Sequence, residues 1–242
     1  MKYNNNIFTV EKCNLNKVVK RFETPIFCYS EKKITENINN FRKNFKSFSP
    51  VICFSTKSNC NLEILKMIKR NGLGADVVSK GELMIALKAG ISSKKIVFSG
   101  VGKTRSELIY AIEKNILLIN SESKSEILEI ESIAKSKSKK VDIGIRLNPN
   151  TDAKTLKQIS TGKKENKFGI NEKTFIEVLE YIKSSKFLNL KCLSVHIGSQ
   201  ILDHKPYEKM LRILDKIIKK TQYKFDFIDL GGGMGIPYNN DK

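Results

Sequence analysis

Short runs of apolar and β-branched residues recur along most of this chain at a nearly constant interval, and this rhythm limits the folds open to it. The runs start near residues 51, 74, 96, 117 and 142, so successive starts are 23, 22, 21 and 25 residues apart. Two further runs start near residues 192 and 225. Segments with helical periodicity separate the runs, and strands that alternate with helices in this way form parallel βαβ units. The sequence therefore predicts an α/β fold, preceded by a helix that ends near Phe45.

The expected helices carry their own start signals. Three of them open with Ser or Thr followed three residues later by Glu, which is the pattern of a capping box. The pairs are Ser79 with Glu82, Thr104 with Glu107 and Ser123 with Glu126. They place helix starts shortly after three of the predicted strands.

Two architectures fit this alternation, a doubly wound open sheet and a (β/α)8 barrel. Polar or glycine residues follow nearly every predicted strand: Lys57, Asp76, Ser99, Asn120, Asn148, His196 and Gly231. A barrel builds its site from all the loops at that end, whereas an open sheet uses one switch point, so the pattern favours the barrel. Seven strands are predicted where a barrel needs eight. Either Pro25 to Ser30 supplies the eighth strand, or the sequence is part of something longer.

Charge and apolar content narrow the class of protein. The 44 Lys and Arg residues against 25 Asp and Glu give a net charge of +19. The basic residues are scattered over every predicted helix instead of forming a block, which argues for a compositional bias and against a nucleic-acid partner. No apolar run reaches the length of a membrane span, and the first residues lack an apolar signal core. We expect a soluble cytoplasmic protein with no membrane partner.

The cysteines and histidines argue against a metal site. Five cysteines form no CxxC pair, and only two histidines, His196 and His204, are available beside them. A zinc site or a disulfide framework needs a different arrangement. Three of the cysteines lie inside apolar runs (Cys28, Cys53 and Cys192), where we expect them to be small buried residues.

Lys57 and His196 each follow an apolar run and are candidates for chemistry. Desolvation at the mouth of an apolar strand can free a lysine amine to form a Schiff base with an aldehyde, although a lysine at such a place is otherwise simply solvated. An imidazole at the end of a strand can stack on an aromatic cofactor or transfer protons. The alternative for His196 is a structural histidine with satisfied hydrogen bonds.

A glycine-rich turn and two charged residues complete the set of candidates. The turn from Gly231 to Gly235, with glycine also at Gly232 and Gly233, lets backbone N–H groups approach a phosphate, or serves as a plain tight turn. It matches neither the P-loop nor the dinucleotide pattern. Asp76 and Arg146 each lie within an apolar strand, where a lone charge is costly to bury. They form either an ion pair that holds the barrel or a pair that orients Lys57 or a cofactor.

These groups make one consistent set when they are taken together. A lysine suits an aldehyde, glycines and Ser199 suit a phosphate, and a flat imidazole and two buried charges lie at the same end of the sheet. Pyridoxal 5'-phosphate, a ring that carries an aldehyde and a phosphate, requires this combination of groups.

The motifs also resemble those of diaminopimelate decarboxylases, which belong to the alanine-racemase-like, barrel-type class of pyridoxal-phosphate enzymes. The resemblance runs from Thr24 to the end of the sequence. The matching stretches are Lys57 to Asn59, Gly74 to Leu83, Phe98 to Thr104, Arg146 to Pro149, Ile159 to Gly162, Asn166 to Ile170, His196 to Gln200 and Asp229 to Gly233. The stretches at Phe98 and Ile159 favour this family over ornithine or arginine decarboxylases.

The resemblance implies a role for each candidate. Lys57 would hold the cofactor aldehyde and His196 would stack on the pyridine ring, both as catalytic residues. Ser199 and the turn formed by Gly231, Gly232, Gly233 and Gly235 would hold the phosphate. Asp76 and Arg146 would orient the lysine and the ring. The family decarboxylates meso-2,6-diaminopimelate to L-lysine and CO2 and forms homodimers.

The resemblance also implies what this sequence lacks. Members of the family continue through a Glu-Pro-Gly-Arg strand, which supplies the ring-nitrogen carboxylate, into a β-rich C-terminal domain that binds substrate. We therefore expect an N-terminal segment at 1–30 and a barrel at 31–242 that lacks its last strand, inactive on its own. Smaller departures are Thr56, Ser58 and Leu156, where valine, alanine and histidine are usual.

Two other interpretations stay open at this point. A single-domain carrier of pyridoxal phosphate would suit the length without any missing part, but the stretches around Lys103 and Lys167 favour a decarboxylase. A decarboxylase of another basic amino acid is the second alternative, because the residues that would discriminate between substrates lie in the absent portion.

Overall fold

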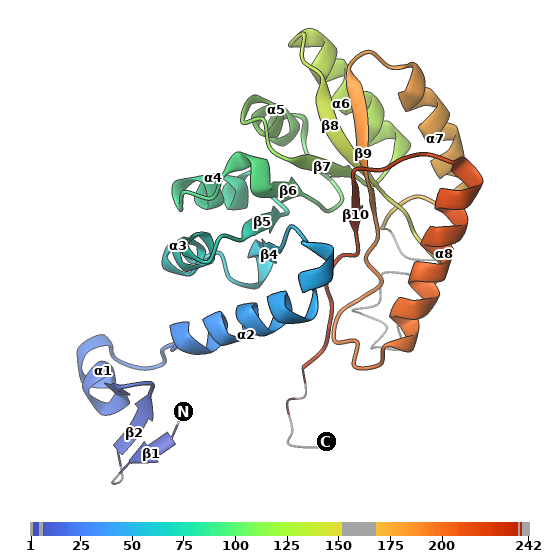
Figure 1. Cartoon of the computed structure of the whole chain (residues 1–242). Coiled ribbons are helices and arrows are strands. Elements are labelled where there is room, and N and C mark those ends of the chain that lie inside the picture. Colours follow the sequence, from blue (N-terminus) through green and yellow to red (C-terminus); the bar gives the residue numbers. More distant parts are fainter. Residues whose placement is uncertain (1, 5–6, 152–167, 237, 239–242) are drawn as a thin grey trace.

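The computed structural model describes residues 2–4, 7–151, 168–236 and 238. Seven parallel strands form one curved sheet in the order β4-β5-β6-β7-β8-β9-β10, as Figure 1 shows. The strands are β4 (Cys53–Ser55), β5 (Gly74–Val77), β6 (Ile96–Phe98), β7 (Leu118–Ser121), β8 (Val141–Arg146), β9 (Leu188–Ser194) and β10 (Phe227–Asp229). The predicted α/β fold is confirmed, and the curved sheet is that of a (β/α)8 barrel without its last strand.

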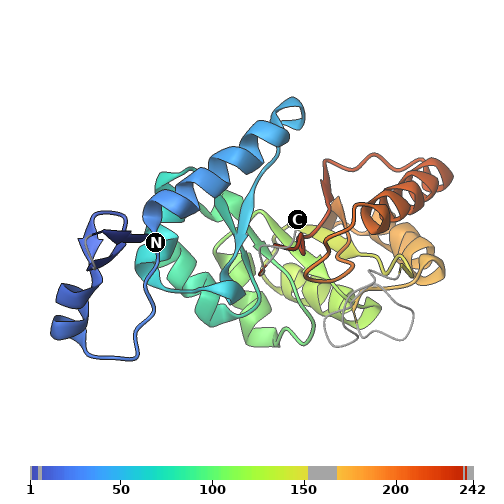
Figure 2. The ribbon, with the colours of Figure 1, turned by 90° about the horizontal axis from the view of Figure 1, so that it is seen from below.

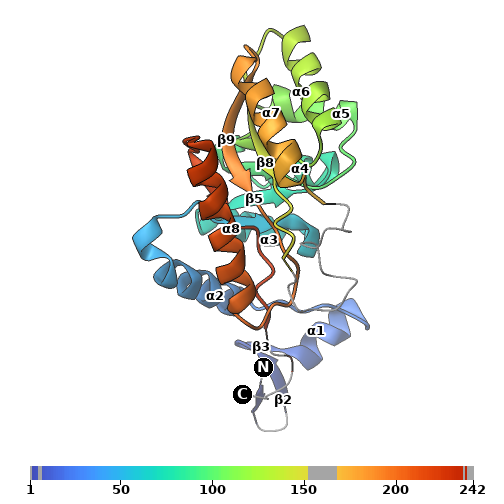
Figure 3. The same cartoon turned by 90° about the vertical axis from the view of Figure 1, so that its right-hand side faces the viewer.

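Six helices follow the strands and lie on the outer, convex face of the sheet (Figures 1 and 2). They are α3 (Leu62–Arg70), α4 (Lys80–Lys88), α5 (Arg105–Glu113), α6 (Lys124–Ser136), α7 (Glu172–Ser184) and α8 (Lys205–Thr221). Figure 3 shows α7 and α8 lying over the end of the sheet that contains β8 and β9. Short 3-10 turns occupy Lys46–Phe48, Thr56–Ser58 and Ser93–Lys95.

Residues 2–4 and 7–22 form a small unit that stands apart from the sheet in Figures 1 and 2. Strands β1 (Lys2–Asn4), β2 (Ile7–Val10) and β3 (Cys13–Asn14) form an antiparallel sheet, followed by α1 (Leu15–Phe22). Helix α2 (Glu31–Asn44) then leads to β4. Glu11 links the two parts, because its Oε1 accepts hydrogen bonds from Ser30 Oγ at 2.7 Å and Lys32 N at 2.9 Å. The division of the chain at residue 30 stays a prediction.

The segment from Pro25 to Ser30 is not a strand, so the prediction that it closes the barrel is wrong. It runs as an irregular connection from α1 to α2, and the side chain of Phe27 is 90% exposed. No strand pairs with the outer edge of β4 among the described residues. The apolar run therefore reflects exposed side chains on a connection, not the core of a sheet.

The sheet buries different residues on its two faces. Side chains on the outer face pack against the helices in one large apolar core, which includes Ala75, Val77, Ile96, Phe98, Ile119, Ile143 and Ile145. Alternate residues point to the inner, concave face. There a small apolar floor is formed by Cys53, Val97, Leu118, Cys192 and Phe227. The next inward-facing residues towards the carboxyl ends of the strands are polar.

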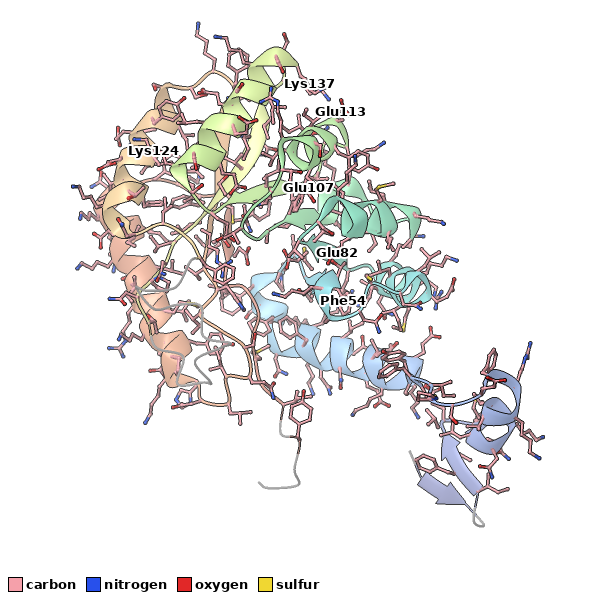
Figure 4. All side chains as sticks on the ribbon, turned by 180° about the vertical axis from the view of Figure 1, so that it is seen from behind. Phe54, Glu82, Glu107, Glu113, Lys124 and Lys137 are labelled. Carbon is pink, nitrogen blue, oxygen red and sulfur yellow. The ribbon has the colours of Figure 1, made fainter. Side chains whose placement is uncertain are left out.

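The capping signals predicted from the sequence are present, and each glutamate at the third helical position also reaches the preceding βα unit. Ser79, Thr104 and Ser123 cap their helices as predicted, with a complete capping box at Thr104. Glu82 accepts a hydrogen bond from Thr56, Glu107 accepts one from Lys80 N, and Glu126 pairs with Lys103. Figure 4 labels Glu82 and Glu107 in neighbouring units, and also Glu113, which pairs with Lys137 at 2.6 Å between α5 and α6.

Several smaller expectations can be compared with the structure. Cys192 is buried and Cys53 is half-buried, but Cys28 is exposed, so the prediction for Cys28 is wrong. Within the described ranges, no three His, Cys, Asp or Glu residues gather as metal ligands. No described helix is both long and apolar enough to cross a membrane. Leu156 and the stretch from Ile159 to Gly162 lie outside the described residues.

Candidate functional site

A layer of polar side chains lies on the inner face of the sheet, above the apolar floor and at the carboxyl ends of the strands. Its members come from six strands or the residues next to them: Ser55, Asp76, Ser99, Asn120, Ser194 and Asp229. We refer to these six residues as the polar layer. Asn120 lies at its centre and donates from Nδ2 to Asp229 Oδ2 at 2.8 Å. The prediction that strand-end polar residues gather at one end of the sheet is thus correct for Asp76, Ser99 and Asn120.

Lys57 lies at the rim of this layer, in the 3-10 turn that follows β4. The preceding residue, Thr56, is fully buried, and its Oγ1 contacts both Glu82 Oε2 and the Asp76 carbonyl oxygen, the latter at 2.9 Å. These two contacts tie the turn to β5 and α4 and fix the backbone next to the lysine. The Lys57 side chain is exposed, and its charge acts on both Asp76 and His196. The amine therefore lies near a carboxyl group and an imidazole.

Asp76 occupies the site as a carboxyl group with a raised pKa. Its pKa is raised to about 6, mainly by burial and also by the nearby charge of Asp229, while hydrogen bonds from Ser99 and Ser55 and the charge of Lys57 act in the opposite direction. A carboxyl group of this kind can exchange a proton near neutral pH. Asp76 is therefore placed to take up or release a proton beside Lys57.

Arg146 pairs with Glu122, so the alternative in which Asp76 and Arg146 form an ion pair is wrong. Arg146 Nη1 donates to Glu122 Oε1 at 2.8 Å, and the two side chains are only 9% and 2% exposed. Glu122 also accepts hydrogen bonds from the N–H groups of Gly100 and Gly169, at 3.1 and 3.0 Å. This carboxylate lies in the loop after β7, and its backbone donors make it the better partner for the guanidinium.

The other side of Arg146 faces the candidate cofactor residues. Its Nη2 lies 3.4 Å from the carbonyl oxygen of His196, and its guanidinium carbon lies 4.8 Å from the centre of the Phe168 ring. Arg146 therefore holds the backbone of His196 as well as Glu122. The sequence did not indicate Glu122 as a site residue, nor the buried pair of Lys103 Nζ and Glu126 Oε1 at 2.6 Å beside it.

His196 is a neutral imidazole in this site at neutral pH. Its pKa is lowered to about 4, mainly by burial and also by the charges of Arg146 and Lys57. Its Nδ1 accepts a hydrogen bond from Gly232 N at 3.3 Å, which assigns the ring proton to Nε2. A neutral ring next to a glycine turn can pack against a flat aromatic group without placing a buried charge there. The second histidine, His204, is exposed at the start of α8.

The glycine turn packs against the segment that carries His196, and three of its glycines are required by this packing. A Cβ at Gly231 would lie 2.6 Å from the Val195 carbonyl oxygen, and one at Gly233 would lie 1.8 Å from the Gly198 carbonyl oxygen. A Cβ at Gly235 would lie 2.9 Å from the backbone carbonyl carbon of Gln200 and 2.7 Å from Leu202 Cδ2. Gly231 and Gly233 also have positive φ, which favours glycine. These three glycines thus bring the turn into contact with the segment between β9 and α8.

Gly232 differs, because a Cβ added there would meet nothing within 4 Å. It lies on the open side of the turn, and its N–H contacts His196. A bare backbone beside open space lets an anion come close to main-chain N–H groups. Ser199 is half-buried in the adjacent segment. The amine, the neutral ring and this open turn have the chemistry that the aldehyde, the ring and the phosphate of pyridoxal phosphate require, so these residues fit that cofactor.

Comparison with known proteins agrees with this geometry. The family model described as "Pyridoxal-dependent decarboxylase, pyridoxal binding domain" matches residues 31–242. The chain belongs to this family. Its pyridoxal-binding domain is the part of the fold that contains the residues described above.

Curated relatives in the family are named diaminopimelate decarboxylase. The one from Helicobacter pylori strain J99 is 44% identical over 232 residues, which are 95% of this chain and 57% of the relative. The one from Campylobacter jejuni is 42% identical over 92% of this chain and 56% of the relative. The chain therefore spans somewhat more than half of the length of these relatives.

Solved structures show the same fold. The diaminopimelate decarboxylase of Helicobacter pylori in complex with L-lysine superposes with a TM-score of 0.89 at 42% identity, covering 95% of this chain and 59% of that chain. The enzyme of Methanocaldococcus jannaschii superposes with a TM-score of 0.92 at 34% identity, over 100% of this chain and 58% of that chain. A lysine decarboxylase from Selenomonas ruminantium, at 22% identity, shares the fold.

Proposed function

We propose that the protein to which this chain belongs decarboxylates meso-2,6-diaminopimelate to L-lysine and CO2. The observation that carries the proposal is the arrangement of Lys57, Asp76, His196 and the glycine turn at one end of a pyridoxal-binding domain. Relatives named diaminopimelate decarboxylase support the choice of reaction. The complexes of two of them with L-lysine support the choice of product.

Pyridoxal phosphate, when bound, supplies an aldehyde for the substrate amine and a ring that draws electrons away from the bond to the carboxylate. In this proposal Lys57 holds the aldehyde of the cofactor. His196 packs on the ring, and its neutral state leaves the positive charge to the ring nitrogen. Ser199 and the turn formed by Gly231, Gly232, Gly233 and Gly235 hold the phosphate. The predicted roles of these residues thus become parts of one binding site.

The residues around Lys57 exchange protons with it and orient the ring of His196. The Asp76 carboxyl, with its raised pKa and with the charge of Lys57 acting on it, would exchange a proton with the Lys57 amine. Arg146 fixes the backbone at His196 and is itself held by Glu122, so the ring is kept in one orientation. The small apolar floor beneath the polar layer keeps water out from below.

We also propose that the protein is a cytoplasmic homodimer. The resemblance to diaminopimelate decarboxylases supports this, whereas the exposed Ile228, Leu230 and Ile236 lie by the edge of β10, where the last strand of a barrel would pair. Exposed apolar side chains of this kind are typical of surfaces that another part of a protein covers. Sedimentation at several concentrations would measure the oligomeric state.

The cofactor part of the proposal is tested by trapping pyridoxal phosphate on the chain with borohydride and mapping the modified peptide by mass spectrometry. We expect the label on Lys57 and none in the Lys57→Ala variant. Lys66→Ala is the matched control, since this lysine lies exposed on α3 in a surface ion pair with Glu63 and should leave labelling unchanged. A label distributed over surface lysines would contradict the site.

The substrate part is tested on the whole protein by measuring CO2 release from the meso, LL and DD isomers of diaminopimelate and from L-ornithine and L-arginine. Release from the meso isomer, with L-lysine as product and loss of activity in Lys57→Ala, is the expected result. Faster release from ornithine or arginine would assign the protein to another basic amino acid.

A further inference from the structure

Asn120 is a buried amide whose contacts extend across the concave face of the sheet. It is 1% exposed and lies on β7, whereas its partner Asp229 lies on β10, with β8 and β9 between them in the sheet. The Nδ2–Oδ2 distance of 2.8 Å joins residues 109 positions apart. Nδ2 also lies 3.3 Å from Ser99 Oγ and 3.4 Å from Ser194 Oγ. The bond to the carboxylate is the shortest of these and, being charge-assisted, the strongest.

The neighbouring strand β8 leaves room for the Asn120 amide at Gly144. Gly144 pairs with Asn120 in the β7–β8 register, and a Cβ at residue 144 would lie 2.1 Å from Asn120 Oδ1. Asn120 Oδ1 has no hydrogen-bond partner among the described atoms. The hydrogen bonds donated by Asn120 Nδ2 therefore set the orientation of the amide. Gly144 is needed because any larger residue would collide with Oδ1 in this orientation.

Asp229 passes this orientation on to the glycine turn. Its Oδ2 accepts from Asn120 and from Ser194 Oγ at 2.9 Å, while its Oδ1 accepts from Gly231 N at 2.8 Å. With both oxygens engaged, the carboxylate cannot rotate without breaking a charge-assisted bond. The start of the turn is thereby fixed from inside the sheet, whereas the packing of Gly233 and Gly235 fixes it from the side of Gly198 and Leu202.

We propose that Asn120 and Asp229 are positioning residues for the phosphate of the cofactor. Asn120 holds the Asp229 carboxylate, Asp229 holds the N–H of Gly231, and the turn then presents its open side at Gly232 to the phosphate. This inference rests on the proposed function, because it assigns the turn to a phosphate. Neither residue needs to touch the cofactor.

The test compares pyridoxal 5'-phosphate with pyridoxal, which has the same ring and aldehyde but no phosphate. Their dissociation constants are measured by absorbance titration for the wild type, for Asn120→Asp and for the exchange variant Asn120→Asp with Asp229→Asn. Asn120→Asp sets two carboxylates against each other. The exchange variant restores one donor and one acceptor with the original net charge, and the amide oxygen at 229 can still accept from Gly231.

We expect Asn120→Asp to weaken pyridoxal 5'-phosphate by about 10- to 100-fold, the range for losing one hydrogen bond to a charged group. Pyridoxal should change by less than about 3-fold, and the exchange variant should regain most of the loss, since it restores the bond. Gly144→Ala displaces the same amide without adding charge and should give the same selective loss, which covers the case that Asn120→Asp does not fold.

Asn189→Asp is the matched control. Asn189 Nδ2 donates to Asp142 Oδ1 at 2.6 Å, so it is also an amide on a carboxylate between strands, but it lies at the amino ends of β8 and β9. It should not change the ratio of the two dissociation constants. An equal loss of both ligands in Asn120→Asp, or no loss of either, would overturn the inference and leave Asn120 with a structural role.

A second readout needs no cofactor. Hydrogen exchange of the amide of Gly231 in the free chain should be faster in Asn120→Asp than in the wild type and slow again in the exchange variant, because Asp229 protects that N–H. Unchanged exchange would contradict the positioning of the turn. If the wild type bound no pyridoxal phosphate, the proposed function would fail separately, and the exchange rates alone would decide whether Asn120 and Asp229 hold the turn.

Discussion

The outer and inner faces of the curved sheet use the same strands in opposite ways. On the outer face, residues such as Phe98 and Ile119 are fully buried against helices. On the inner face, a thin apolar floor supports the polar layer, where Asp76, Asn120 and Asp229 lie close together. The outer face therefore supplies most of the hydrophobic free energy of folding, whereas the inner face carries buried polar groups that cost free energy and provide chemistry. The comparison predicts that equal changes on the two faces have unequal effects.

The largest loss of stability is expected at the buried ion pair of Arg146 and Glu122. Arg146→Met should lower the free energy of unfolding by about 3–5 kcal/mol, because it leaves the buried Glu122 carboxylate without its cation. Arg105→Gln is the control, since Arg105 pairs with Glu129 on the surface and its loss should cost less than about 1 kcal/mol. Urea unfolding of both variants measures the difference, and similar small losses would show that the pair adds nothing to stability.

Two neighbouring residues of β7 compare the faces directly. Ile119 belongs to the outer core and Leu118 to the inner floor, and both are buried. Ile119→Ala should cost about 3–4 kcal/mol, and Leu118→Ala about 2 kcal/mol, because fewer apolar neighbours surround a side chain on the thin floor. Urea unfolding of the two variants tests the order. A larger loss at Leu118 would reverse the assignment of stability to the outer face.

A third effect is a change of stability with pH at Asp76. Its pKa is about 6 in the folded protein and near 3.8 when unfolded, so the folded state binds the proton more tightly, and the charged form costs stability above pH 6. Asp76→Asn removes this cost. The variant should gain stability relative to the wild type at pH 8, and the gain should shrink as the pH falls from 6 to 4. Unfolding at several pH values, without cofactor, checks this. A gain that is the same at pH 8 and pH 4 would mean that the carboxyl group is not desolvated.

The fold was predictable because parallel strands covered on both sides are apolar, and their spacing along the chain repeats. The segment at Pro25 to Ser30 misled the prediction, since its apolar side chains look like those of a strand but find no neighbour in the sheet. A local pattern carries no information about whether a partner strand exists. The same limit explains Cys28, which lies in that segment and is exposed.

The sequence allowed most residues of the candidate site to be predicted, but not which residues they contact. Asp76 and Arg146 were both recognised as charges in apolar strands, yet Arg146 pairs with Glu122, because two backbone N–H groups from distant loops converge on that carboxylate. Asp229 carries the signal that was used for Asp76, a carboxylate at the end of an apolar run, and could have been found by it. The role of Asn120 depends on the curvature of the sheet, which no local pattern encodes.

The glutamates at the helix starts contact the βα unit that precedes their own, and these contacts affect the order in which the chain can fold. Glu82, Glu107 and Glu126 each complete a contact with the βα unit made before their own, across 26, 27 and 23 residues. A nascent chain therefore finishes one unit whenever the first turn of the next helix leaves the ribosome. Contacts of this short range lose little chain entropy on closure and form quickly. The sheet is expected to grow in one direction from β4 to β7, so that during synthesis the growing edge moves to the newest strand while the outer edge of β4 stays unpaired.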